Sequence, residues 1–367
     1  MYAFYNCINL TTASFPLVTS INTYAFYNCT NLTTVSFPLA TTIGAYAFYS
    51  CNNLTTVNFP LATTISSGAF YSCINLTTID FPSVTAIGSS AFASCYNLTT
   101  VSFPSATSIS DYAFYHCSSL TTINFPSVTI IGSSAFYSCI NLTTIDFPSV
   151  TAIGTNAFYH CSNLTTVNFP SVTSIGSYAF SSCFSLTTID FSVNFPLFTS
   201  NILPIGMFAN CYNLTTIKLT STITSIGAYA FRSCSNLTTV SFSLITSIGS
   251  YAFANCSNLT AVNFSSVTSI GSYAFSSCHS LTTAYFPSLT GSIYSHAFRS
   301  CWNLISLYLT EVSKVPGLNT NAFLSTPIST YSTVAGRYGS IFVPSSLYLS
   351  FTKAVGWSVY SARMVSV

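Results

Sequence analysis

The stretch S-V-T-S-I-G-S-Y-A-F-S-S-C-F-S-L-T-T-I-D-F-S, residues Ser171–Ser192, is one copy of a 22-residue phrase that fills most of the chain. Its cysteine, Cys183, ends a run of nine cysteines that begins at Cys7 and recurs every 22 residues. After a 28-residue step the cysteines continue at intervals of 22 or 23 residues, from Cys211 to Cys301. A fixed period of this length is typical of stacked supersecondary units, so the sequence predicts a repeat solenoid.

Each copy contains a short alternating segment. In Leu32–Gly44 the apolar residues Val35 and Phe37 alternate with the polar residues Thr34 and Ser36. This alternation predicts a strand with Val and Phe inward and Thr and Ser outward. Stacked copies would place equivalent strands side by side, about 4.8 Å apart.

The rest of the copy predicts turns. Pro38 lacks an N–H and ends the strand, and Gly44 is expected where the backbone bends in a way that glycine adopts easily. The phrase A-Y-A-F-Y-S-C, Ala45–Cys51, predicts one short helical or 3₁₀ turn. Tyr46 and Tyr49, three residues apart, would point away from its buried face.

Composition restricts the function classes. Only 3% of the residues are charged, against roughly 25% in an ordinary domain, so Ser, Thr, Asn and Tyr must face water. The charges before position 218 sum to −4 and the charges from Lys218 onward sum to +6. Neither part has the dense basic patch that nucleic-acid binding requires. Polar residues interrupt every apolar stretch, which argues against membrane insertion, and from the opening residues we expect no signal peptide in this sequence.

The recurring motif A-F-x-x-C-x-x-L-x-x-[VI]-x-F-P-x-x-x-x-I-G resembles the BspA-type leucine-rich repeats of bacterial surface proteins. The resemblance covers about residues 2–308 and implies a right-handed solenoid, with short parallel strands on one face and short helical or 3₁₀ turns opposite. It implies exposure at a surface, adhesion as the usual role, and neither catalytic residues nor cofactors. The tail, Thr320–Val367, is similar to the closing segment of repeat proteins from gut bacteria and their phages, by analogy a C-terminal cap.

We therefore expect about fourteen repeats of 22–23 residues over 1–308, the first incomplete, followed by a last divergent repeat and a cap over 309–367. Three departures interrupt the pattern. An insertion lies near residues 192–204, Met207 replaces the usual Ala, and Thr220, Ser243 and Ser265 replace the usual Pro.

The cysteines favour a buried row of thiols. Disulfide frameworks have irregular spacing, whereas these cysteines take one core position in each repeat, and their parallel side chains do not suit the disulfide dihedral. A metal site is also disfavoured, because a line of sulfurs offers no tetrahedron. We therefore expect neither a disulfide nor a bound metal.

The third residue of each strand varies while its neighbours stay constant, which marks a candidate binding stripe on the concave strand surface. We single out Asn58, Asp80, Asn124, Asp146, Asn168, Asp190, Lys218, Tyr285 and Tyr308. A merely solvated face explains the stripe equally well. Catalysis by the aspartates is disfavoured, since an open strand surface offers no pocket.

Tyrosines recur beside the Ala-Phe dipeptide on the opposite, convex side, where they suit sugar stacking or protein packing. The candidates are Tyr24, Tyr46, Tyr49, Tyr112, Tyr178, Tyr229 and Tyr251. Copying of an ancestral repeat explains them equally well.

These observations predict a non-enzymatic scaffold at a cell surface, in the extracellular space or on a phage particle, which binds a host protein or glycan. The alternative is a structural protein that assembles head to tail into a filament, as its low charge and opposite-signed parts suggest. Ice or crystal-surface binding through the Thr rows is a third hypothesis.

Overall fold

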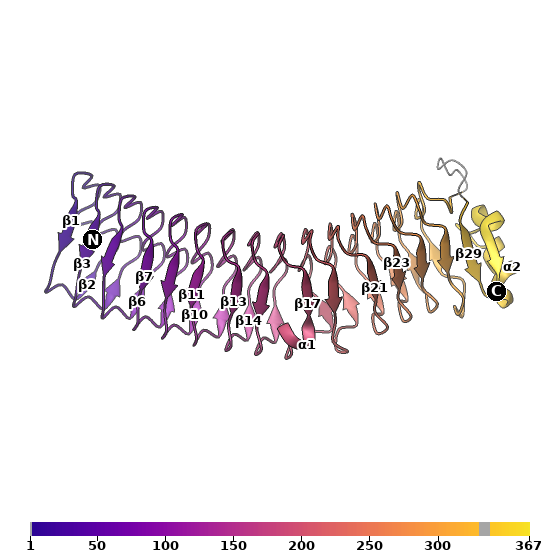
Figure 1. Ribbon diagram of the computed structural model, residues 1–367, viewed down its shortest axis with the longest axis horizontal. Coiled ribbons are helices and arrows are strands. Elements are labelled where there is room, and N and C mark those ends of the chain that lie inside the picture. Colours follow the sequence, from indigo (N-terminus) through magenta and orange to yellow (C-terminus); the bar gives the residue numbers. More distant parts are fainter. Residues whose placement is uncertain (1, 330–337) are drawn as a thin grey trace. The chain divides into compact units, whose positions relative to one another are not determined.

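The computed structural model describes residues 2–329 and 338–367 (Figure 1). The chain forms two compact units, which are described separately. Unit 1 comprises Met1–Ser185 with Val193–Phe198, and unit 2 comprises Leu186–Ser192 with Thr199–Val367. Each unit is a solenoid of parallel strands, in which most coils contribute one three-residue and one two-residue strand. The predicted repeat solenoid is confirmed.

Unit 1 contains two rows of strands. Its three-residue strands are β1 (Thr12–Ser14), β3 (Thr34–Ser36), β5 (Thr56–Asn58), β7 (Thr78–Asp80), β9 (Thr100–Ser102), β11 (Thr122–Asn124), β13 (Thr144–Asp146) and β15 (Thr166–Asn168). Its two-residue strands form one eight-stranded sheet of β2 (Ser20–Ile21), β4 (Thr42–Ile43), β6 (Thr64–Ile65), β8 (Ala86–Ile87), β10 (Ser108–Ile109), β12 (Ile130–Ile131), β14 (Ala152–Ile153) and β16 (Ser174–Ile175).

Unit 2 repeats this plan and adds helices. One row holds β17 (Thr188–Asp190), β19 (Thr216–Lys218), β21 (Thr239–Ser241), β23 (Ala261–Asn263), β25 (Thr283–Tyr285), β27 (Ser306–Tyr308), β29 (Ser340–Val343) and β30 (Met364–Ser366). The other holds β18 (Ile202–Leu203), β20 (Ser225–Ile226), β22 (Ser247–Ile248), β24 (Ser269–Ile270), β26 (Ser292–Ile293) and β28 (Gly317–Leu318). The helices near the C-terminus are η1 (Ser345–Leu347), α2 (Tyr348–Lys353) and η2 (Ser358–Arg363), while α1 (Phe191–Asn194) begins the insertion.

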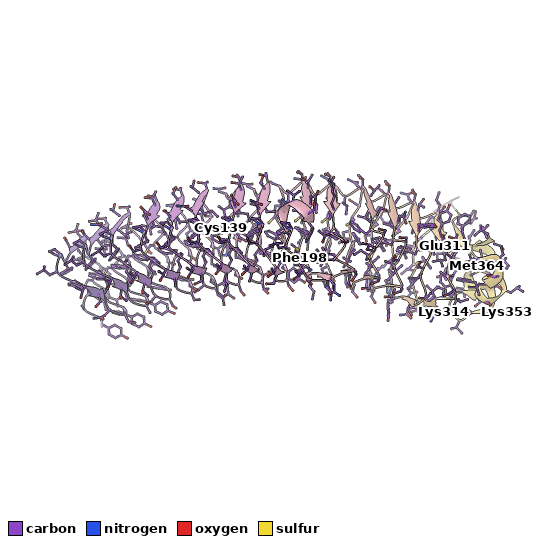
Figure 2. The ribbon with its side chains drawn as sticks, turned by 90° about the horizontal axis from the view of Figure 1, so that it is seen from below. Cys139, Phe198, Glu311, Lys314, Lys353 and Met364 are labelled. Atoms are coloured by element: carbon purple, nitrogen blue, oxygen red, sulfur yellow. The ribbon has the colours of Figure 1, made fainter. Side chains whose placement is uncertain are left out.

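Identical residues form rows through the core of each unit; Figure 2 labels Cys139, a member of the cysteine row. The Cys139 thiol donates to the Phe114 carbonyl oxygen at 3.2 Å, and thiols in neighbouring coils repeat this contact with the phenylalanine 25 residues back. Phe136 stacks on Phe114 with ring centroids 5.3 Å apart. Burial raises the pKa of the Cys95 thiol to about 12. The expected buried cysteine row is therefore confirmed.

The phrase Ala45–Cys51 is a pair of tight turns and not a helical turn, so that prediction was wrong. Tyr46 and Ser50 have φ of 53° and 55°, in the left-handed region that interrupts a right-handed helix. The N–H groups of Tyr46, Phe48 and Ser50 donate to carbonyls of the next coil, in the case of Phe48 to the Ala69 carbonyl at 2.8 Å. These donors bond between coils, and a helix would have kept them inside one coil.

Gly44 is required for close approach. Its φ is not positive, but a Cβ there would lie 2.7 Å from backbone atoms of Ile21 and Asn22 in the preceding coil. Glycine therefore allows adjacent coils to pack backbone against backbone, which differs from the predicted local bend.

Aromatic residues of the C-terminal segment cover the last coil of unit 2. The Phe323 ring meets Tyr360 edge-on at 5.6 Å and Trp357 at 6.3 Å. Trp357 is fully buried and donates from Nε1 to the Pro316 carbonyl oxygen at 2.7 Å. The phenylalanine row is therefore shielded from water at this end.

Candidate binding surface on the strand face

The outward side of the three-residue strands, here called the strand face, carries the predicted stripe. The middle residue of each strand points inward and the flanking residues point outward, as in Thr144–Asp146, where Ile145 is 1% exposed. Parallel register places third residues side by side, for example Asp146 beside Asn168. The variable position therefore forms a surface wherever adjacent strands pair.

Hydrogen bonds join several predicted site residues in unit 1. Asn168 Nδ2 donates to Asp146 Oδ1 at 2.8 Å, and Asn124 Nδ2 donates to Ser102 Oγ at 3.4 Å. In each bond the amide donates toward the preceding coil. The side chains of the stripe are thus partly ordered by one another.

The stripe is not continuous, which corrects the prediction of a single row. Among the described residues of unit 1, β5 does not pair with β7, and β11 does not pair with β13. The inward residues beside these breaks, Val57 and Ile123, are half-buried and not buried. Asn58 and Asp80 therefore lie on opposite sides of one break, and Asn124 and Asp146 lie on opposite sides of the other.

Both breaks come directly before a strand that ends in aspartate. A carboxylate only accepts hydrogen bonds, so it needs a donor on each side to be joined to both neighbours. Asn168 supplies that donor after Asp146, whereas Asn124, before it, donates to Ser102 in the opposite direction. The order of polar residues along the row is therefore consistent with the positions of the breaks.

In unit 2 the stripe begins with an ion pair. Lys218 Nζ lies 3.2 Å from Asp190 Oδ2, with side chains 69% and 27% exposed. Hydrogen bonds from the Ser192 hydroxyl and from Lys218 lower the pKa of Asp190. These two predicted site residues are adjacent, and the pair is open to water.

Farther along unit 2 the strand face becomes aromatic. Tyr308 stacks on Phe342 with centroids 4.4 Å apart, and Tyr285 lies 5.9 Å from Tyr308. The Tyr285 hydroxyl donates to Glu311 Oε1 at 3.3 Å. Phe342 was missed because it lies in the irregular tail, although its strand, S-I-F-V, keeps the alternation of the repeats.

Most predicted tyrosines of the opposite side cover one another's faces. Tyr24 stacks on Tyr46 at 5.4 Å, and Tyr229 stacks on Tyr251 at 4.9 Å. Tyr24 and Tyr251 are stacked on both faces, which disfavours sugar stacking there, whereas Tyr46 and Tyr229 each end a stacked row beside a glycine position. Tyr112 differs, because serines occupy its position in both adjacent coils and it is 44% exposed.

Tyr49 belongs to a second stacked row, with Tyr71 at 5.0 Å. Tyr178 adopts the same left-handed backbone as Tyr112 and is half-buried. Within residues 2–329 and 338–367, no three His, Cys, Asp or Glu side chains gather as metal ligands would. Over the same residues, no helix has the length and apolar character to span a membrane.

The repeats match a known family model. The BspA type leucine rich repeat region, a model of six copies, matches residues 1–107, 85–203 and 201–329. Among curated proteins, none matches this chain.

Solved structures that are similar to this chain come from several bacteria. A leucine-rich repeat protein from Bacteroides ovatus is 26% identical over 78% of this chain and 88% of its own, with a TM-score of 0.52. A leucine rich cell surface protein from Faecalibacterium prausnitzii is 29% identical over 76% of this chain and 79% of its own, with a TM-score of 0.48. The pneumococcal vaccine antigen PcpA is 17% identical over 97% of this chain and 87% of its own, with a TM-score of 0.50.

Proposed function

This chain belongs to the BspA-type leucine-rich repeat family, and from that premise we propose that it is a non-enzymatic binding scaffold displayed at a cell or particle surface. Proteins of this type are typically surface binding scaffolds. The proposed partner is a host surface protein or glycan, recognised through the strand face.

One observation supports the strand face above the other surfaces. Its third position changes from coil to coil, through Ser, Asn, Asp, Lys and Tyr, while the adjacent inward residue stays aliphatic in nearly every coil. The constant inward residues maintain the core, so the outward residues are free to vary for recognition of a partner. The stacked tyrosines of the opposite side present mainly edges, so they support the proposal less.

The test is a pull-down from host surface extracts with the purified chain. The variant Asp146→Lys should reduce capture about tenfold, because it reverses a charge in the joined pair with Asn168. The control variant Tyr112→Ser alters the opposite side and should capture normally. Loss with the Tyr112 variant alone would move the binding surface to the turns and reject the proposal.

The same purified chain also tests the two alternative functions, head-to-tail assembly and ice binding. Assembly would give light scattering that grows with concentration, yet aromatic residues of the tail already cover Phe323 at one end. Ice binding needs an uninterrupted row of hydroxyls, and thermal hysteresis would reveal it. The breaks beside Val57 and Ile123 interrupt such a row in unit 1.

A further inference from the structure

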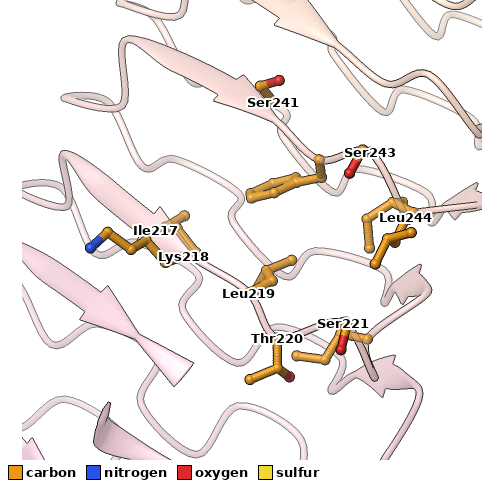
Figure 3. Close-up of a pocket in the computed structure, with 11 residues that line it drawn as sticks. Ile217, Lys218, Leu219, Thr220, Ser221, Ser241, Ser243 and Leu244 are labelled. Carbon is orange, nitrogen blue, oxygen red and sulfur yellow. The ribbon is translucent and has the colours of Figure 1, made fainter. Parts of the chain in front are cut away.

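A third break in the strand face, in unit 2, encloses a cavity. Within the described residues β19 does not pair with β21, and a cavity of about 410 Å³, here called the slot, lies between residues 217–223 and 241–245. Most Cα pairs between the two strands lie beyond 8 Å, whereas paired parallel strands run about 4.8 Å apart. Figure 3 shows Leu219 and Thr220 facing Ser243 and Leu244 across it.

Three departures from the repeat lie beside the opening. In regular coils the Ser171 hydroxyl donates to the Pro148 carbonyl oxygen of the preceding coil at 2.7 Å. Leu244 occupies the position of Ser171 and is 50% exposed, but Leu39 and Leu61 occupy it in coils whose strands pair, so the missing hydroxyl does not by itself open the strand face. One residue is also added between Leu219 and Ile223, which widens the turn where Pro is missing.

The opening is limited to the strand face. On the other side of the coils β20 pairs with β22, through Ser225 beside Ser247. In the core Phe208 stacks on Phe231 with centroids 6.0 Å apart. Because these rows hold the coils together, the slot is present before any ligand arrives.

The walls of the slot combine two kinds of chemistry. Ile217, Leu219 and Phe242 are half-buried, unlike the buried Phe147 and Phe169 of regular coils. In regular coils the Phe147 N–H donates to the Asn168 carbonyl at 3.1 Å, but the described residues show no equivalent bond from Leu219 to Ser241. The slot therefore offers apolar surface between two strand edges.

We propose that the slot binds an extended peptide segment of a partner, three to four residues long, with a bulky apolar side chain placed against Phe242. Within the described residues the facing edges of β19 and β21 do not pair with each other, and an extended segment is the kind of ligand that adds to such strand edges. Donors and acceptors on both edges suit a peptide backbone, which carries both at every residue. The Lys218 ammonium is paired with Asp190 and points away from the two turns, so the segment needs no acidic residue.

The test uses an array of capped hexapeptides that alternate Thr with one varied apolar residue. Binding to the whole chain, followed by fluorescence anisotropy, should favour aromatic or large aliphatic residues. N-methylation of alternate amides should weaken binding at least tenfold, because it removes the backbone donors. Equal binding of the methylated peptides, or no binding at millimolar concentration, overturns the proposal.

Matched variants locate the site. The double variant Ser243→Pro with Leu244→Ser replaces two residues that line the slot and should weaken binding at least tenfold. Ser265→Pro restores the same residue in a coil whose strands already pair, and it should bind normally. Unchanged binding by the double variant rejects the slot, and displacement of the peptide by a maltose-series sugar or a lysolipid would reassign it.

The inference rests on the proposed function, because it names a partner class for part of the strand face. The proposed function and the slot proposal can each be rejected without the other. Normal capture from host extracts by the Ser243→Pro, Leu244→Ser variant, with no peptide binding by the unmodified chain, rejects the slot alone.

Discussion

Two pairs of neighbouring coils have similar sequences, but their strands pair in one case and do not pair in the other. In unit 1, β13 and β15 pair in register, and Ile145 and Val167 are 1% and 2% exposed. In unit 2, β19 and β21 stand apart, and Ile217 is half-buried. The difference teaches that the core rows fix the stack, while the pairing of each strand face is decided separately from them.

The largest difference should appear when a phenylalanine is removed from each pair. Phe147 is 1% exposed and stacks on Phe169 at 5.6 Å, so Phe147→Ala should lower the free energy of unfolding by about 3–5 kcal/mol. Phe242→Ala should cost roughly half as much, because that ring is half-buried. Urea unfolding followed by circular dichroism measures both, and equal losses would mean that the slot is closed in solution.

Thiol labelling tests how deep the slot reaches. Cys7 is partly exposed, and Cys211 and Cys234 are as buried as Cys139. Burial raises the pKa of Cys139 and Cys234, so little thiolate exists at about pH 8. Iodoacetamide should label Cys7 at least about a hundredfold faster than the buried cysteines, a factor equivalent to roughly 2.8 kcal/mol of opening.

Mass spectrometry of the labelled peptides separates the individual cysteines. Fast labelling of Cys211 or Cys234, with Cys139 protected, would show that the opening continues into the core. Labelling in urea provides the control, since all 14 cysteines should then react.

Ser171→Leu should weaken a regular coil without opening it, because Leu39 and Leu61 occupy the same position in coils whose strands pair. Ser171→Leu removes the hydroxyl that donates to the Pro148 carbonyl and should cost about 1 kcal/mol. The reverse change, Leu244→Ser, should be neutral or slightly stabilising. Thermal melts compare the two variants, and a stabilised Ser171→Leu protein would contradict the role given to this hydrogen bond.

The smallest effect should come from the ion pair at the edge of the slot. Asp190→Asn should change the free energy of unfolding by less than about 0.5 kcal/mol, because the pair is exposed to solvent. The Asp190 pKa is lowered in the folded state, so its contribution is complete above the unfolded pKa of about 4. It is lost as pH falls through the folded pKa.

Stability curves of the two proteins should therefore converge in acid, and they should also converge in high salt. A difference that grows as the pH falls would show that the carboxylate is not stabilised in the folded state.

Much of the stack could be predicted from the repeat. Cys139 and Phe136 lie in rows because every coil places the same residue at the same position. The turns over Ala45–Cys51 were predicted wrongly, since Ala, Phe and Tyr give no local signal for the left-handed backbone at Tyr46. Hydrogen bonds to the next coil hold that conformation, and a single repeat contains no such partner.

The individual residues of the candidate surface were predicted, but the breaks that divide them into groups were not. Thr220 and Ser243 stood out as missing prolines, yet nothing in the sequence predicted a cavity beside them. The slot depends on which hydrogen bonds form between β19 and β21, and that becomes visible only when the coils are stacked.

The sequence by itself determined the period, the inward and outward positions and the buried rows, because these follow from local alternation repeated at a fixed interval. Tertiary structure alone decided which strands pair, where the stripe breaks and where the slot lies between Leu219 and Leu244. The physical reason is that each of these outcomes depends on hydrogen bonds between residues about one coil apart. Whether such a bond forms depends on the geometry of both coils together.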